Sequence, residues 1–161
     1  MIVILMGVSG SGKTTIGLRL AGELQWRFVD ADDLHSPENI RKMASGQPLS
    51  DGERKPWLAL LRHEVEESSA RNENVIIACS ALKDVYRKLL VVDPAVVRVV
   101  YLKGSIDLIR ERLLGRSGHF MKDDLLVSQF ATLEEPTDAL VIDIDDRPGK
   151  VVDKVRAALG V

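Results

Sequence analysis

The residues with the most specific chemistry are 7–14, which read Gly-Val-Ser-Gly-Ser-Gly-Lys-Thr. They match the G-x-x-x-x-G-K-[ST] phosphate loop, in which glycines let successive backbone N–H groups turn inward around a polyphosphate at a helix N-terminus. Lys13 is expected to reach the β- and γ-phosphates, and the Thr14 hydroxyl to ligate Mg²⁺. We therefore predict binding of a nucleoside triphosphate by the loop and the residue after it: Gly7, Val8, Ser9, Gly10, Ser11, Gly12, Lys13, Thr14 and Thr15.

Two aspartates, Asp30 and Asp32, follow the second apolar run of the chain. In an extended segment, residues two apart lie on the same face, so both carboxylates can approach a γ-phosphate. One would hold the hydration shell of Mg²⁺, while the other would accept a hydrogen bond from an acceptor hydroxyl and take its proton. The alternative is a helix cap or a solvated acidic turn. The nearby phosphate loop favours the catalytic interpretation.

Arginines occur at two further places where an anion could need them. The planar guanidinium of Arg54 matches a carboxylate and could select an acidic substrate, the alternative being a surface arginine on an amphipathic helix. Arg112 and Arg116 lie one helical turn apart, and His119 follows in a loop punctuated by glycines. We expect residues 115–124 to form a lid over the bound phosphates, and the alternative is a solvated helix face.

Apolar runs and helical patterns alternate along the chain. Strands are predicted at residues 2–6, 27–30, 74–78, 96–102 and 140–143. Helices are predicted after the phosphate loop, from Ser36 to near Gly46, from a capping box at Ser50 and Glu53, and at about residues 83–90, 106–114, 124–130 and 149–159. The longest helix should bury an apolar stripe of Trp57, Leu60, Leu61 and Val65. This order predicts an α/β fold, a three-layer sandwich of about five parallel strands with helices on both faces, whose ligands bind at the carboxyl ends of the strands.

Bulk properties set the outer limits of function. The chain has 161 residues, a formal net charge of −2 and one cysteine, Cys79. Its length suits a single domain over residues 1–161, and its charge argues against a nucleic-acid-binding surface. We find no run apolar enough for a membrane span and no leader pattern, so we expect a cytoplasmic protein without a membrane partner. Cys79 is expected to be a small buried residue at a strand end.

Missing motifs narrow the class of nucleotide-binding protein. No Asn-Lys-x-Asp guanine reader of a GTPase occurs, and the third apolar run ends in Ala78, Cys79 and Ser80 rather than in the acidic pair of helicases and transporter ATPases. Size and layout instead suit a small-molecule kinase. Its substrate would be held by a helical segment at about residues 33–72.

Several further stretches make the resemblance specific: residues 32–35 (Asp-Asp-Leu-His), 39–43 (Asn-Ile-Arg-Lys-Met), 46–49 (Gly-Gln-Pro-Leu), 54–58 (Arg-Lys-Pro-Trp-Leu), 79–83 (Cys-Ser-Ala-Leu-Lys), 86–87 (Tyr-Arg), 118–121 (Gly-His-Phe-Met) and 128–134 (Ser-Gln-Phe-Ala-Thr-Leu-Glu). With the phosphate loop, they resemble the small P-loop gluconokinase family over residues 1–136. Ala31 and Gly52 depart from its pattern. The resemblance implies an adenylate-kinase-like fold, a homodimer, and phosphorylation of D-gluconate on its 6-hydroxyl with ATP and Mg²⁺.

The resemblance also implies roles for individual residues. Lys13, Asp32 and Arg116 would be catalytic, Thr14 and Asp30 would hold Mg²⁺, and Arg112 and Arg116 would contact the nucleotide. A carboxylate with a polyol chain needs a cationic clamp and several short polar partners. The substrate would therefore be bound by Asp32, His35, Arg54, Ser80, Lys83, Arg87, His119 and Gln129.

Three other interpretations remain open. A shikimate kinase has a similar layout, but places a run of glycines where this chain has Ser80, Ala81 and Leu82. A nucleoside monophosphate kinase would carry Gly-aromatic-Pro-Arg after the third strand, which is missing here. A regulator that binds nucleotide without catalysis would need no second cluster of substrate-binding residues.

Overall fold

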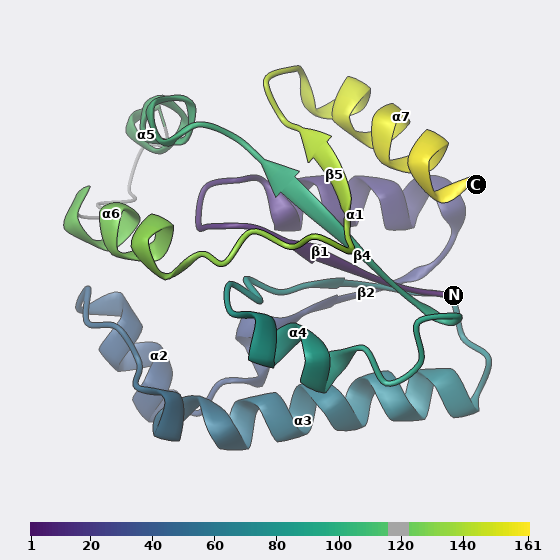
Figure 1. Cartoon of the computed structure of the whole chain (residues 1–161), viewed down its shortest axis with the longest axis horizontal. Helices are drawn as coiled ribbons and strands as arrows, with labels where there is room; N and C mark the ends of the chain where they lie inside the picture. Colours follow the sequence, from purple (N-terminus) through teal and green to yellow (C-terminus); the bar gives the residue numbers. More distant parts are fainter. Residues whose placement is uncertain (116–122) are drawn as a thin grey trace.

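A computed structural model describes residues 1–115 and 123–161. In this part of the chain a five-stranded parallel sheet has the order β2-β3-β1-β4-β5 (Figure 1). The strands are β1 (Ile2–Met6), β2 (Arg27–Asp30), β3 (Val75–Ala78), β4 (Val97–Lys103) and β5 (Leu140–Asp143). The helices are α1 (Lys13–Leu24), α2 (Pro37–Ala44), α3 (Asp51–Ala70), α4 (Asp84–Leu90), α5 (Ile106–Leu114), α6 (Asp123–Thr132) and α7 (Pro148–Leu159). The predicted fold class is confirmed.

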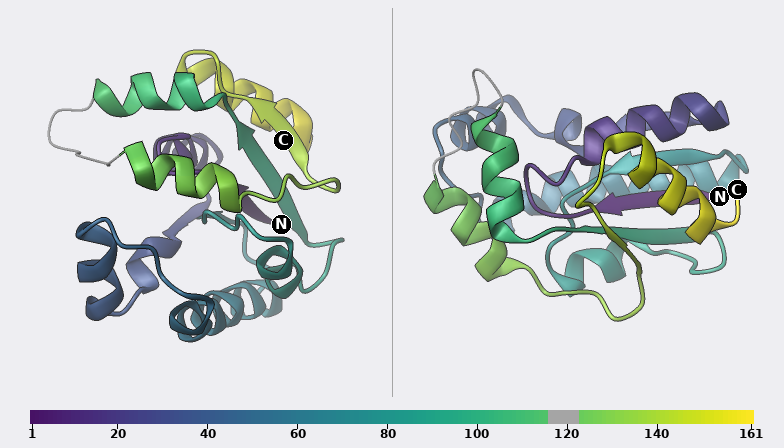
Figure 2. Two further views of the ribbon diagram at one scale, coloured as in Figure 1. Left: turned by 60° about the vertical axis from the view of Figure 1, so that its left-hand side comes forward. Right: turned by 90° about the horizontal axis from the view of Figure 1, so that it is seen from above.

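Strand β1 shows why helices cover both faces of the sheet. All five of its residues are buried, and successive side chains point to opposite faces. Val3 and Leu5 belong to one hydrophobic core, which includes residues of α1 and α7, whereas Ile2, Ile4 and Met6 belong to a second, which includes residues of α3 and α4. These helices lie above and below the sheet in Figure 1, and Figure 2 shows the same layers from two other directions.

Local signals place the helix starts well. The Ser36 side chain accepts from the Asn39 N–H at the start of α2. Both halves of the predicted capping box at Ser50 and Glu53 are formed at the start of α3. The stripe predicted for α3 is partly wrong, because Leu60 is 53% exposed and Leu58 is buried in its place.

The acidic turn after β2 differs from the extended segment that the alternation of Asp30 and Asp32 predicts. The chain enters a short 3-10 helix, η1 (Ala31–Leu34), directly after Asp30. Asp30 is its N-cap, with a carboxylate oxygen 3.1 Å from the Asp32 nitrogen that donates to it. The same-face argument is therefore wrong, because this local hydrogen bond bends the backbone.

A close helix-to-strand contact gives a stability prediction. A Cβ at Gly17 of α1 would lie 2.4 Å from Phe28 Cε2, whereas a Cβ at Gly22 of the same helix would meet no atom of the described part of the chain within 4 Å. Overpacking costs about 1–3 kcal/mol, against a helix-propensity gain of about 1 kcal/mol. We expect Gly17→Ala to lower the free energy of unfolding in urea and the matched Gly22→Ala to raise it. Equal stabilisation by both changes would contradict this packing.

Candidate active site

The phosphate loop joins β1 to α1 and presents the N-terminus of that helix. Gly10 and Gly12 have φ values of +84° and +95°, which L side chains rarely adopt. The Lys13 Nζ donates to the carbonyl oxygens of Gly7 (3.0 Å) and Val8 (3.1 Å), so the side chain folds back along the loop. The ammonium is thus held beside the backbone donors that a polyphosphate would use.

The acidic turn approaches the start of α1. The Thr14 hydroxyl donates to the second carboxylate oxygen of Asp30 at 2.8 Å. A hydroxyl and a carboxylate form a suitable donor set for Mg²⁺, which takes few protein ligands and completes its shell with waters and phosphate oxygens. In residues 1–115 and 123–161, no group of three or more His, Cys, Asp or Glu side chains could hold a metal ion. The Thr14–Asp30 pair fits an ion that takes most of its ligands from water and phosphate.

Asp32 and Lys13 influence each other's protonation. Desolvation by surrounding protein raises the pKa of the Asp32 carboxyl, an effect that the charge of Lys13 opposes and that of Asp30 adds to. Burial lowers the pKa of Lys13, while Asp32 opposes this change. Cys79 lies nearby at the end of β3, buried as predicted, and burial raises its thiol pKa to about 12. The thiol is therefore a packing group, and desolvation makes the Asp32 carboxylate a stronger base than an ordinary aspartate.

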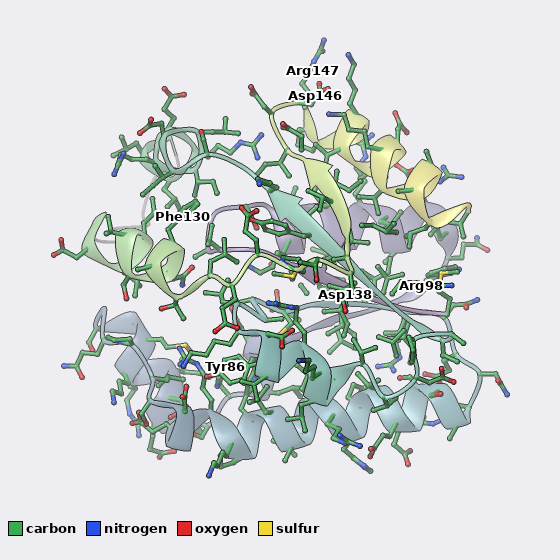
Figure 3. All side chains as sticks on the ribbon, in the orientation of Figure 1. Tyr86, Arg98, Phe130, Asp138, Asp146 and Arg147 are labelled. Carbon is green, nitrogen blue, oxygen red and sulfur yellow. The ribbon has the colours of Figure 1, made fainter. Side chains whose placement is uncertain are left out.

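A pocket of about 650 Å³ opens on the other side of the phosphate loop. The Arg112 guanidinium donates to the carbonyl oxygens of Ile144 and Asp146 and so fixes the loop between β5 and α7. Asp146 and Arg147 lie on that loop at the top of Figure 3. A nucleoside would fit here beside its phosphates. The pocket-lining residues include Gly12, Thr15, Arg112, Asp146, Arg147 and Pro148.

Two cations gather around one tyrosine at the starts of α3 and α4. The Arg54 guanidinium carbon lies 6.0 Å and the Lys83 Nζ 5.7 Å from the centre of the Tyr86 ring. Lys83 donates to both oxygens of Asp51 at 2.9 and 3.0 Å, and the Tyr86 hydroxyl donates to the same carboxylate. We call Asp51, Arg54, Lys83 and Tyr86 the Tyr86 cluster; its tyrosine lies at the end of α4 nearer α2 in Figure 3.

The Tyr86 cluster adds two residues that the sequence interpretation did not assign. The Asp51 carboxylate accepts hydrogen bonds from the Lys83 ammonium and the Tyr86 hydroxyl, and it lies 3.9 Å from the Arg54 guanidinium. These donors therefore have a geometry that suits a carboxylate. Tyr86 follows Lys83 by three residues, which is one helical turn, and this spacing is the signal that could have identified it.

His35 lies between the acidic turn and the Tyr86 cluster. Its ring stacks on Trp57 with centroids 4.4 Å apart, and the Trp57 indole donates to the Ala31 carbonyl at 2.6 Å. Burial, with the charge of Arg54, lowers the His35 pKa and favours the neutral ring. Among residues 1–115 and 123–161, the buried Nδ1 of His35 has no hydrogen-bond partner. The site therefore runs from Asp32 past His35 to Arg54.

Three other predicted substrate contacts have different surroundings. Arg87 is buried and donates to the carbonyls of Ala81 (3.0 Å) and Leu82 (3.1 Å), which favours a structural role over contact with a substrate. The side-chain amide oxygen of Gln129 accepts from the Ser9 N–H of the phosphate loop at 2.6 Å. The backbone carbonyl of Ser80 accepts from the Gly7 N–H at 3.3 Å. Arg116, His119 and most of the predicted lid at 115–124 lie outside the described residues.

The fold and this site define a class: a P-loop phosphotransferase with a nucleotide site and a second, cation-bearing site. A family model described as shikimate kinase matches residues 9–159. The chain is 49% identical to the thermoresistant gluconokinase of Escherichia coli K12 over 148 residues, covering 89% of this chain and 85% of that protein. We found no helix in the described residues that is long and apolar enough to cross a bilayer.

Solved structures agree with these matches. The crystal structure of a gluconokinase from Sinorhizobium meliloti 1021 has a TM-score of 0.88 and 41% identity, covering 98% of this chain and 90% of that one. Shikimate kinase from Aquifex aeolicus, with a TM-score of 0.61 and 16% identity over 99% of this chain and 96% of that one, shares the fold. The chain belongs to the gluconokinase family, within the wider group of kinases that the shikimate kinase model covers.

Proposed function

We propose that this chain transfers the γ-phosphoryl group of ATP to the 6-hydroxyl of D-gluconate, giving 6-phospho-D-gluconate. The observation that carries the proposal is the placement of Arg54 and Lys83 around Tyr86, beside an acidic turn that contacts the phosphate loop. An acid with a hydroxyl at its far end fits a site that is cationic at one end and carries a base at the other. Relatives at 49% and 45% identity named as gluconokinases support this choice of acid.

The geometry suggests how the substrate lies. Its carboxylate would accept from Arg54, Lys83 and the Tyr86 hydroxyl. It would thus replace the Asp51 carboxylate, with which these three groups interact in this structure. Its chain would then run past His35, whose neutral ring can exchange hydrogen bonds with hydroxyls. The terminal hydroxyl would reach Asp32 at the edge of the phosphate loop.

In the reaction, the 6-hydroxyl oxygen forms a bond to the γ-phosphorus, and the bond from that phosphorus to the β,γ-bridging oxygen of ATP breaks. Asp32 orients the hydroxyl and accepts its proton, a role that its raised pKa favours. Lys13 neutralises charge on the transferred group. Mg²⁺, bound with ATP, would be held by Thr14 and Asp30 and would supply further charge neutralisation.

The organisation of the chain follows from the same proposal. We assign residues 33–72 to the acceptor side, since they carry His35, Arg54 and Trp57, and we treat residues 1–161 as a single kinase domain. A homodimer in the cytoplasm, without nucleic-acid or membrane partners, stays a prediction.

A substrate panel tests the proposal. Purified protein with Mg-ATP is offered D-gluconate, other sugar acids and shikimate, and the product is identified by mass and by the position of its phosphate in ³¹P and ¹³C NMR spectra. We expect turnover of gluconate with phosphate on carbon 6. Turnover of shikimate but not gluconate would contradict the proposal in favour of shikimate kinase, and no ATP consumption with any acid would favour a nucleotide-binding regulator.

A further inference from the structure

Glu134 lies two residues beyond α6 and holds the backbone on both sides of Lys83. Its side-chain oxygen accepts from the Asp84 N–H at 2.6 Å. Its own N–H donates to the Leu82 carbonyl at 2.9 Å. Lys83 is therefore flanked by two contacts from Glu134, which lies fifty positions beyond Asp84 in the chain.

These contacts compensate for the lack of a capping side chain at the start of α4. Lys83 is the N-cap of α4, with φ −95° and ψ 143°, and its side chain makes no capping hydrogen bond. An ammonium has no acceptor, whereas the N-cap position favours Asn, Asp and Ser because they accept from the free N–H groups of the first turn. Glu134 supplies the missing acceptor. The Lys83 ammonium is thereby left to extend toward Asp51 and the Tyr86 ring.

The segment that carries Glu134 also contacts the phosphate loop. Gln129 of α6 accepts from the Ser9 N–H, and Leu133 packs against both hydrophobic cores. The loop after β3 reaches the same place through Ser80, whose carbonyl accepts from the Gly7 N–H. The backbone around Lys83 is thus connected to the phosphate loop by two routes, one through Ser80 and one through residues 129–134.

We propose that Glu134 is a positioning residue for Lys83. Glu134 affects the substrate only through Lys83 and does not touch the substrate itself. Glu134 fixes the backbone at the start of α4. The Lys83 ammonium is thereby directed toward the carboxylate of the substrate and is held at a fixed position relative to the phosphate loop. This role rests on the proposed function, because the acid that Lys83 meets is gluconate. It assigns a purpose to the Ser-Gln-Phe-Ala-Thr-Leu-Glu stretch at 128–134, which the catalytic steps leave unused.

Steady-state kinetics of three variants test this role. Glu134→Ala removes the acceptor and is expected to raise KM for gluconate about fivefold, the factor that corresponds to the free energy of about 1 kcal/mol usual for one lost cap, with KM for ATP within about twofold of wild type. Glu134→Gln keeps an acceptor oxygen and is expected to stay within about twofold for both substrates. The matched control is Glu135→Ala, which removes an exposed ion pair to Lys103 at 2.8 Å and a side-chain hydrogen bond with Tyr101, and is expected to change neither KM.

A double-mutant cycle with Lys83→Met separates positioning from general stability. If Glu134 acts through the Lys83 ammonium, adding Glu134→Ala to Lys83→Met will not raise KM for gluconate further. Additive effects, or an unchanged KM in folded Glu134→Ala, would overturn the role. Should Glu134→Ala fail to fold by circular dichroism, the cycle is run with Glu134→Asp, whose carboxylate stops one methylene short, and the same criteria apply. A wild-type protein without gluconate turnover contradicts the proposed function itself, and the role of Glu134 with it.

Discussion

Asp32→Asn is expected to lower kcat for gluconate by about 10²- to 10⁴-fold, the usual contribution of a positioned general base. The carboxylate lies where the phosphate loop and the acceptor side meet, and desolvation raises its pKa so that it accepts a proton more readily. An asparagine keeps the shape of the side chain and the backbone N–H that donates to the Asp30 carboxylate. Binding of ATP should therefore change little.

The measurement is kcat by a coupled assay together with the Kd for ATP by calorimetry. Asp33→Asn is the matched control, because Asp33 is an exposed neighbour in η1 for which we assign no catalytic role. We expect it to stay within about threefold of wild type, as exposed positions usually do. Unchanged turnover in Asp32→Asn would exclude both the base and the orienting role.

The raised pKa of Asp32 predicts two further results, one for the pH dependence of turnover and one for stability. Turnover should fall as the pH decreases through that pKa, so the acid limb of kcat/KM should lie above 3.8, the ordinary pKa of an aspartate. Because folding raises the pKa, the ionised carboxylate destabilises the folded chain above that pH. Asp32→Asn is thus expected to raise the melting temperature at pH 7 while it lowers activity. A lower melting temperature would contradict the desolvation argument.

Lys13→Met is expected to lower kcat by about 10²- to 10³-fold, as when one preorganised donor to a developing charge is removed. The Lys13 ammonium is held at the phosphate loop by the carbonyls of Gly7 and Val8, so it is in place before the nucleotide binds. Methionine keeps most of the side-chain volume but supplies no charge. The loss should therefore appear in catalysis without unfolding the chain.

The measurement for Lys13→Met is single-turnover phosphoryl transfer at saturating ATP, with circular dichroism as a check on folding. Lys88→Met serves as control, since Lys88 is 77% exposed on α4 and pairs only with Asp84 in the described part of the chain. The control is expected to retain wild-type rates. A single-turnover rate in Lys13→Met within tenfold of wild type would show that the backbone donors of the loop suffice.

Local patterns predicted most of the fold because each rests on neighbouring residues. The apolar run of β1 needs no information from elsewhere to indicate a strand buried on both faces, and Ser50 with Glu53 forms its capping box within one turn. The boundaries of β1, β2, β5 and α5 agree with the prediction, and those of the other strands and of α4, α6 and α7 differ by one or two residues.

The site was harder to predict because its contacts join distant segments. Gln129 accepts from Ser9 across 120 positions, and no local pattern can place that amide on the phosphate loop. Arg87 resembles a substrate cation by its charge alone, yet it is buried and its Nη1 atom donates to the Ala81 and Leu82 carbonyls. Helical spacing also misplaced Leu60, since it cannot decide which side of a wide apolar stripe meets the sheet.

The strand order has a consequence for synthesis on the ribosome. β1 pairs with β3 and β4, and β2 pairs with β3, so the first two strands of the chain are not neighbours. β1, which leads into the phosphate loop, therefore has no strand partner until β3, at Val75–Ala78, has also been synthesised. Parallel pairings between distant segments form slowly, which leaves the apolar strands exposed while translation continues. The apolar residues of β1 and β2 therefore stay without a strand partner until β3 is available, and in that interval the nascent chain is exposed to aggregation.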